Sequence, residues 1–155
     1  MSYPLRHISI RVPWHDTGWD GRVCSAPHLN GDCLILKRIA EAEMTAASGG
    51  SDILLAQQPV GPNLVRFMQL QERFPEIAFS ATVDSAEVVT AFEKTNLPAS
   101  LFVDIDCGMH RTGIAPGKKA LALCQQISDA DHLEFAGLHA YDGHLHQPDL
   151  IDRTE

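Results

Sequence analysis

Side chains able to do chemistry gather in two short stretches of the second half of the chain, and the first is 107-CGMHRTGI-114. Its two glycines allow the backbone to turn and to approach a ligand closely. Arg111 offers a planar fork of N–H donors that suits a carboxylate, phosphate or phenolate oxygen. The alternative is that Arg111 pairs with Asp104 or Asp106 in a structural network, and the sequence leaves both interpretations open.

The second stretch is 137-GLHAYDGHLH-146, which follows an expected strand. Gly137, His139 and Tyr141 alternate along it and should share one face of that strand. A tyrosine at the exit of a strand can stack on a flat ligand or hydrogen-bond to it. We therefore take Tyr141, together with His139 on the same face, as candidate ligand-binding residues.

Two more histidines, His144 and His146, raise the question of a metal site. As ligands they would need a third partner, such as Asp142 or Asp149, and solvated loop histidines are the favoured interpretation. A zinc hydrolase that adds His139 to this pair would also need a carboxylate base, and the sequence does not supply that geometry. No metal ligand is therefore predicted.

The elements that must position these residues follow a regular rhythm from residue 39 onward. Apolar runs expected to be strands recur every 24 to 33 residues, with a helical pattern between them, which is typical of parallel βαβ units. One helix should end at Gly49, one should begin at Pro62, and one should open at Asp84, with Glu87 completing a capping-box spacing. The expected strands are 53–56, 77–83, 101–106 and 134–141.

Residues 1–38 do not share this rhythm, and the sequence divides the chain into 1–38, an irregular segment of separate origin, and 39–155. The net charge of −8 is uneven: residues 1–38 carry five basic and three acidic residues, against seven and seventeen in 39–155. The acidic part should repel a phosphate backbone, so no nucleic-acid partner is expected. The sequence contains no apolar run of roughly 18 residues or more, so no membrane helix is expected. The four cysteines form no CxxC pair, and a reducing cytoplasm is expected.

A family resemblance follows from three segments: VDIDCGMHRTGI, EFAGLHAYDGHLHQPDL and, ahead of them, IAEAEMTAASGGSDILLAQQPVG. Together they resemble the D-threonine aldolases, which share a pyridoxal-phosphate barrel with the D-serine dehydratases and alanine racemases. The resemblance covers about residues 39–155. It implies an α/β fold, an incomplete parallel (β/α)8 barrel of the TIM type spanning roughly strands two to six.

What the resemblance implies about the site is specific. The family's arginine in GMxRTG, which matches Arg111, approaches the phenolic oxygen of pyridoxal phosphate. The family's tyrosine in the YDGH motif, which matches Tyr141, lies beside the cofactor ring. The implied reaction is the retro-aldol cleavage of a β-hydroxy-D-amino acid to glycine and an aldehyde, with the cofactor as electron sink.

The lysine that this chemistry requires is not found where the family has it. The family's Schiff-base lysine ends the first barrel strand, and the corresponding region here, roughly RVPWHDTG, contains none. The lysines of the chain are Lys37, Lys94, Lys118 and Lys119. By the family's pattern, the later strands and the C-terminal domain with the divalent-metal ligands would follow residue 155. No catalysis by this chain alone is therefore expected.

The expected half barrel would leave two sheet edges open, which predicts self-association. Two alternatives from other classes remain beside the aldolase origin. One is a non-catalytic interaction module that reuses part of a barrel. The other is a recombined reading frame without a selected function.

Overall fold

A six-stranded sheet organises the protein in the computed structural model, which describes residues 22–23 and 33–141. The strands lie in the order β1-β2-β3-β4-β5-β6, so spatial order follows chain order. β1 pairs with β2 in antiparallel fashion, and β2 to β6 are parallel to one another. The strands are β1 (Arg22–Val23), β2 (Cys33–Leu36), β3 (Asp52–Leu55), β4 (Ala78–Val83), β5 (Ala99–Ile105) and β6 (Leu133–Ala140).

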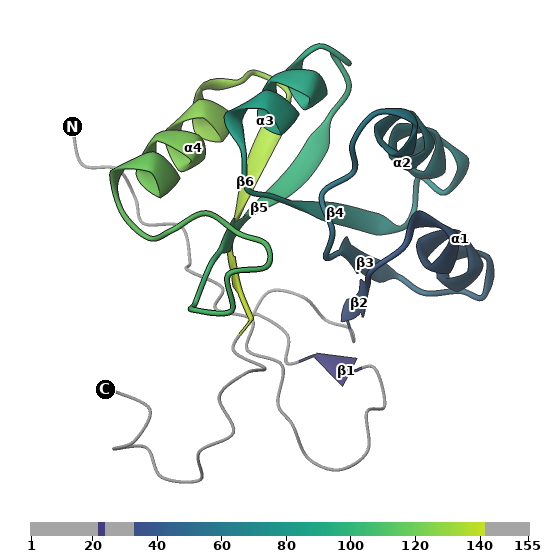
Figure 1. The fold of residues 1–155 in the computed structure, drawn as a ribbon. Coiled ribbons are helices and arrows are strands. Elements are labelled where there is room, and N and C mark those ends of the chain that lie inside the picture. The colour runs from purple at the N-terminus through teal and green to yellow at the C-terminus, as the bar shows by residue number, and fades with distance from the viewer. Residues whose placement is uncertain (1–21, 24–32, 142–155) are drawn as a thin grey trace, which may run out of the picture.

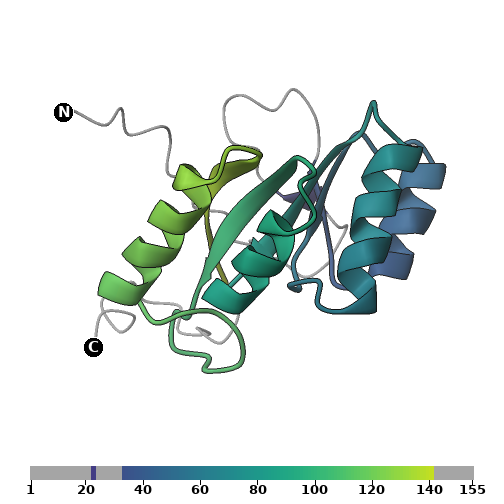
Figure 2. The same ribbon diagram turned by 90° about the horizontal axis from the view of Figure 1, so that it is seen from above.

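Four helices connect the parallel strands and all cover one face of the sheet (Figures 1 and 2). They are α1 (Ile39–Ala47), α2 (Pro62–Arg73), α3 (Ala86–Glu93) and α4 (Lys118–Asp129). α1 ends just before Gly49, whose φ of 90° favours glycine, and Pro62 begins α2, as predicted. Within the described ranges, no helix is long and apolar enough to cross a membrane.

Each of the strands β2 to β5 is followed by a helix that returns the chain to the start of the next strand, which is the connection that parallel pairing requires. The predicted α/β class is therefore confirmed. The sheet does not close on itself within the described residues, since β1 and β6 are its terminal strands there. β2 was not expected, because it falls in the segment assigned to 1–38, yet it pairs with β3 over Leu34 to Leu36.

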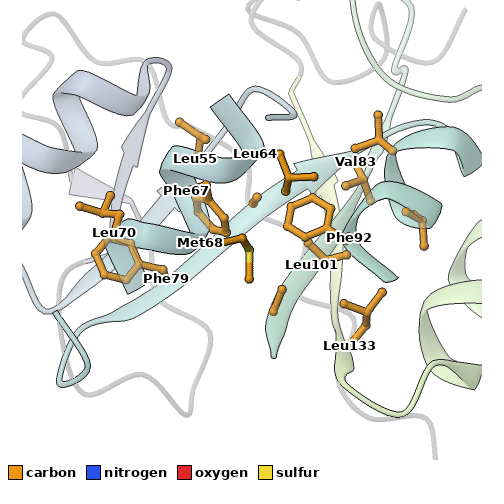
Figure 3. Packing of buried hydrophobic residues seen from close by; sticks show 14 of the residues in the cluster. Leu55, Leu64, Phe67, Met68, Leu70, Phe79, Val83, Phe92, Leu101 and Leu133 are labelled. Atoms are coloured by element: carbon orange, nitrogen blue, oxygen red, sulfur yellow. The ribbon is translucent and has the colours of Figure 1, made fainter. Parts of the chain in front are cut away.

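The core lies between the helices and the facing side of the sheet, where alternate strand residues point toward the helices (Figure 3). Phe67 of α2 is fully buried and makes edge-to-face contacts with Phe79 of β4 and Phe92 of α3, with ring centroids 6.4 and 6.0 Å apart. These contacts join two helices to the sheet through one aromatic cluster. Parallel pairing from β2 to β6 places the carboxyl ends of these strands at a common edge.

The opposite face of the sheet carries a different set of side chains. Leu54 and Phe102 form a small apolar cluster there with Cys33. Toward the carboxyl ends the same face turns polar, with Thr82, Asp104 and His139 all buried. In a parallel α/β fold this is where ligands bind.

Candidate functional site

The candidate site is a small hollow at the carboxyl edge of β5 and β6. It is lined by Asp104 and Ile105 at the end of β5, by five residues of the following loop, and by Tyr141 just after β6; the loop residues are Asp106, Cys107, Met109, Arg111 and Thr112. Sequence analysis selected Arg111 and Tyr141 from separate motifs, and the structure brings both into one hollow. Adjacent parallel strands meet at this edge, so their exit loops converge.

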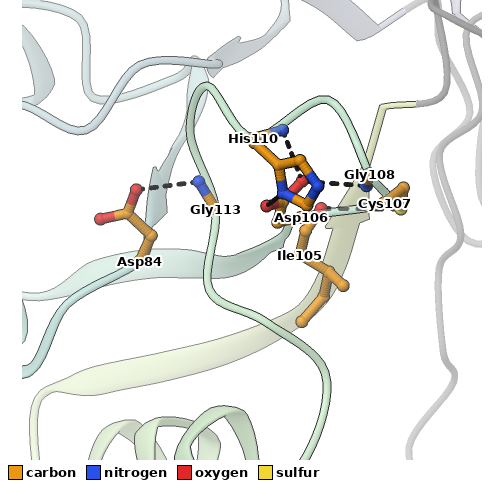
Figure 4. A network of polar contacts seen from close by, with 7 residues as sticks. All are labelled: Asp84, Ile105, Asp106, Cys107, Gly108, His110 and Gly113. Atoms are coloured by element: carbon orange, nitrogen blue, oxygen red, sulfur yellow. Dashed lines mark hydrogen bonds and ion pairs between the residues drawn. The ribbon is translucent and has the colours of Figure 1, made fainter.

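The loop after β5 is held in shape by Asp106. One oxygen of its carboxylate accepts hydrogen bonds from the backbone N–H groups of Gly108 and His110, at 2.9 and 3.0 Å (Figure 4). The other oxygen lies 2.7 Å from Nδ1 of His110. These bonds stabilise the charged carboxylate and lower the pKa of Asp106 to about 2, with the His110 backbone N–H as the largest cause. Asp106 therefore shapes this turn as an anion.

A second anchor fixes the far end of the same loop. Asp84, which follows β4, accepts a hydrogen bond of 3.0 Å from the backbone N–H of Gly113. Ile114 then rejoins the sheet, since its N–H donates to the carbonyl of Asp104 and its carbonyl accepts from Asp106 N–H. Sequence analysis expected Asp84 to open a helix, and that prediction was wrong by one residue, because Ser85 is the N-cap of α3. The carboxylate is instead used to hold the loop.

Arg111 lies over an aromatic ring rather than beside a carboxylate. Its Cζ is 5.7 Å from the centroid of the Tyr141 ring, within the range of a cation–π contact. Within the described part of the chain, Arg111 makes no ion pair. The aspartates considered as its partners are both engaged by histidines: His139 contacts Asp104 and His110 contacts Asp106. The structure thus favours an arginine available to a ligand over one used in a structural network.

His139 forms a buried pair with Asp104 of the neighbouring strand. Its Nδ1 lies 2.6 Å from Oδ1 of Asp104, and both side chains are more than nine-tenths buried. Asp104 lines the hollow and His139 does not, so the histidine sits behind the aspartate. Asp104 is therefore the residue of this pair that a ligand in the hollow would meet. Sequence analysis considered Asp104 only as a partner for Arg111.

A shift in strand register makes this pair possible. Leu101 pairs with Phe135, but the next residue of β5, Phe102, pairs with Gly137, so Ala136 is an extra residue in β6. Gly137 has a φ of 140°, which favours glycine. Without the extra residue Leu138 would oppose Asp104; with it, His139 does.

The side chains that were considered, and not favoured, as metal ligands cannot be placed in the same way. His144, His146, Asp142 and Asp149 lie outside the described residues. Among the residues that are described, no group of three or more His, Cys, Asp or Glu side chains is arranged to hold a metal ion.

All four lysines of the chain are described, and none lines the hollow. Lys37 is exposed and follows β2, four strands away from β6 in the sheet, which is about 19 Å along a sheet at the usual strand spacing. Lys94 is at the C-terminus of α3, and Lys118 and Lys119 open α4. The hollow therefore offers a cation, an aromatic ring and two carboxylates, but no lysine amine for covalent attachment.

The fold and the hollow define a parallel α/β protein with its site at the carboxyl edge of the sheet. The family model described as alanine racemase, N-terminal domain, matches residues 21–155, and the chain belongs to this family. The match begins within the segment that sequence analysis set apart as 1–38.

Individual relatives narrow the comparison. The chain is 32% identical to a D-threonine aldolase of Arthrobacter sp over 111 residues, 69% of this chain and 29% of that protein. It is 26% identical to a 3-hydroxy-D-aspartate aldolase of Paracoccus denitrificans (strain Pd 1222) over 122 residues, 75% of this chain and 31% of that protein. The crystal structure of a D-threonine aldolase from Filomicrobium marinum superposes with a TM-score of 0.65 at 27% identity, covering 75% of this chain and 31% of that one. The chain thus spans about 30% of the length of the relatives it matches.

Proposed function

We propose that the described part of the chain forms the cofactor-binding wall of a pyridoxal-phosphate barrel of the D-threonine aldolase type. The observation that supports this most directly is the Arg111–Tyr141 pair: an arginine without an ion pair in the described structure stands over an aromatic ring at the carboxyl edge of the sheet. The family and its aldolase relatives support the same assignment.

The residues of the hollow suit the chemistry of this cofactor. Pyridoxal phosphate is flat and carries a phenolic oxygen, so a guanidinium can take the oxygen while an aromatic side chain packs beside the ring. Arg111 and Tyr141 would fill these two roles. When bound, the cofactor supplies an electron sink for carbanions formed on an amino acid. The substrate that we propose for an enzyme built on this barrel is a β-hydroxy-D-amino acid, which is cleaved to glycine and an aldehyde.

We propose further that this chain by itself binds the cofactor without a specific covalent bond and does not catalyse the cleavage. The support is the position of the lysines, since none lines the hollow. A Schiff base needs an amine in reach of the cofactor's aldehyde, and all four lysines are exposed.

Titration with pyridoxal phosphate, followed by borohydride reduction and mass spectrometry, tests both proposals. Wild-type protein should bind the cofactor, and Arg111→Ala should weaken binding by about tenfold or more, because a hydrogen bond to a charged group contributes about 1.5–3 kcal/mol. Arg73→Ala is a matched control, since Arg73 also lies over an aromatic ring, that of Phe74, at 5.3 Å on α2. This control should leave binding unchanged.

Mass spectrometry of the borohydride-reduced samples shows whether a lysine is bound covalently to the cofactor. Scattered, substoichiometric adducts on the exposed lysines are expected. A stoichiometric adduct on one lysine, Lys37 above all, would overturn the proposed absence of an anchor and would justify an aldolase assay with D-threonine. Equal binding by wild type and Arg111→Ala would overturn the role of the hollow.

A second candidate, an interaction module, is favoured by the edge strand β6. Within the described residues β6 pairs only with β5, over Leu133 to Ala140, so one side of it faces no other described strand. Open strand edges are templates for pairing with another chain. Self-association would give a concentration-dependent mass in sedimentation, whereas a constant monomer mass would exclude it.

A further inference from the structure

Arg111 shares its hollow with two carboxylates, Asp104 and Asp106, and pairs with neither. Asp106 is committed to the turn of its own loop by two backbone N–H groups and His110. Asp104 has one described side-chain partner that could hold it, His139, at 2.6 Å. Without His139, the carboxylate of Asp104 would lack a hydrogen-bond partner from any described side chain.

The direction of this hydrogen bond follows from the groups involved. An ionised carboxylate only accepts hydrogen bonds, so Nδ1 of His139 must carry the proton and donate. Both side chains are more than nine-tenths buried, where a carboxylate without a donor is costly. Without His139, Asp104 would therefore require another hydrogen-bond donor, and the exposed side chain of Arg111 is a cation in the same hollow.

We infer that His139 is a positioning residue that keeps Asp104 away from Arg111 and so leaves the guanidinium free for an anionic oxygen of the ligand. The identity of the ligand rests on the proposed function, whereas the effect of His139 on Asp104 and Arg111 concerns this chain alone. His139 acts through Asp104 and touches no ligand in the hollow. The sequence suggested direct cofactor contact for His139, and the role that we infer here is an indirect one.

Two substitutions at His139 separate the hydrogen bond from the ring. His139→Phe keeps a ring but has no donor, so Asp104 is released; His139→Asn places an amide N–H near the position of Nδ1 and retains the bond. The readout is the ¹⁵N–¹H signal of the Arg111 side chain Nε–H, recorded without any ligand and identified by its loss in Arg111→Lys. His139→Phe should shift this signal and protect it from exchange with water, and His139→Asn should leave it as in the wild type.

Further variants complete the cycle. Asp104→Asn, alone or with His139→Phe, removes the carboxylate that loss of His139 would release, while Asp106 stays bound to its own turn, so it should give the wild-type signal. His132→Phe is the control, because His132 is a half-buried histidine that contacts the carbonyl oxygen of Glu93, away from the hollow. Titration with pyridoxal phosphate should show about fivefold weaker binding by His139→Phe alone, equivalent to the roughly 1 kcal/mol of a partly exposed ion pair.

The outcomes are distinguishable from those of the proposed function. An unchanged Arg111 signal in folded His139→Phe overturns the inference, whatever the cofactor does. Should His139→Phe fail to fold, Asp104→Asn decides: a shifted Arg111 signal would mean that Asp104 already contacts Arg111 and would overturn the inference. A wild-type chain that shows the expected Arg111 signals but binds no pyridoxal phosphate refutes only the proposed function.

Discussion

Replacing Gly113 by alanine should destabilise the protein more than the same substitution at Gly49. Gly113 has a φ of 94°, which side chains rarely adopt, and a Cβ added there would lie 2.6 Å from the backbone nitrogen of Asp106 and 2.8 Å from the carbonyl carbon of Ile105. Both atoms belong to backbone at the end of β5, so neither can move aside as a flexible side chain would. The loop must therefore shift away from the end of β5, which disturbs the hydrogen bond from Gly113 N–H to Asp84.

The magnitude can be separated into two contributions. A left-handed backbone costs an L-residue about 1–2 kcal/mol. Steric overlap in a packed site adds about 1–3 kcal/mol. Gly49→Ala isolates the first contribution, because Gly49 has nearly the same φ, 90°, and an added Cβ would meet nothing within 4 Å. We expect about 1–2 kcal/mol for Gly49→Ala and about 2–5 kcal/mol for Gly113→Ala.

Urea unfolding followed by circular dichroism measures both free energies, provided that the slopes with denaturant agree. The reasoning requires Gly113→Ala to exceed Gly49→Ala by about 1 kcal/mol or more, the lower end of the overlap contribution. Equal losses would refute it, because the close approach of the loop to β5 would then carry no energetic cost. Weaker binding of pyridoxal phosphate by Gly113→Ala, but not by Gly49→Ala, would show that the same backbone strain also disturbs the hollow.

Two further predictions concern the loop and the core. The pKa of Asp106 is lowered to about 2. Its contribution to loop stability is therefore fully present above its ordinary pKa near 4 and is lost as the pH falls through about 2. The amide NMR signals of Gly108 and His110 should titrate together in that window, and Asp106→Asn should abolish the titration. Joint titration of both amides in Asp106→Asn would assign the effect to another group. Phe67→Ala should lower the free energy of unfolding by about 3–5 kcal/mol because the ring is fully buried, whereas Val65→Ala on the exposed side of the same helix should change it by less than about 0.5 kcal/mol; similar losses for both would contradict the described orientation of α2.

Much of the fold could be predicted because its signals are local. The spacing of apolar runs predicts strands, the glycine at Gly49 and the proline at Pro62 mark helix ends, and each signal depends on residues a few positions apart. The placement of Arg111 and Tyr141 at one edge also follows locally, since each comes just after a strand and parallel strands end together. The sequence does not predict β2, because this strand lies in a segment without the rhythm of the rest.

The working contacts of the site depend on distant parts of the chain, and only the tertiary structure decided them. The sequence predicts Asp84 as the start of a helix, but its carboxylate accepts a hydrogen bond from Gly113, 29 residues further along the chain. Asp104 and His139 are 35 residues apart, and they face each other because one extra residue in β6 shifts the register. Strand and helix patterns are written in neighbouring residues, whereas a register shift of a single residue changes every partner beyond it. The sequence by itself determined which residue types reach the edge of the sheet, and the tertiary structure decided which of them remain available to a ligand.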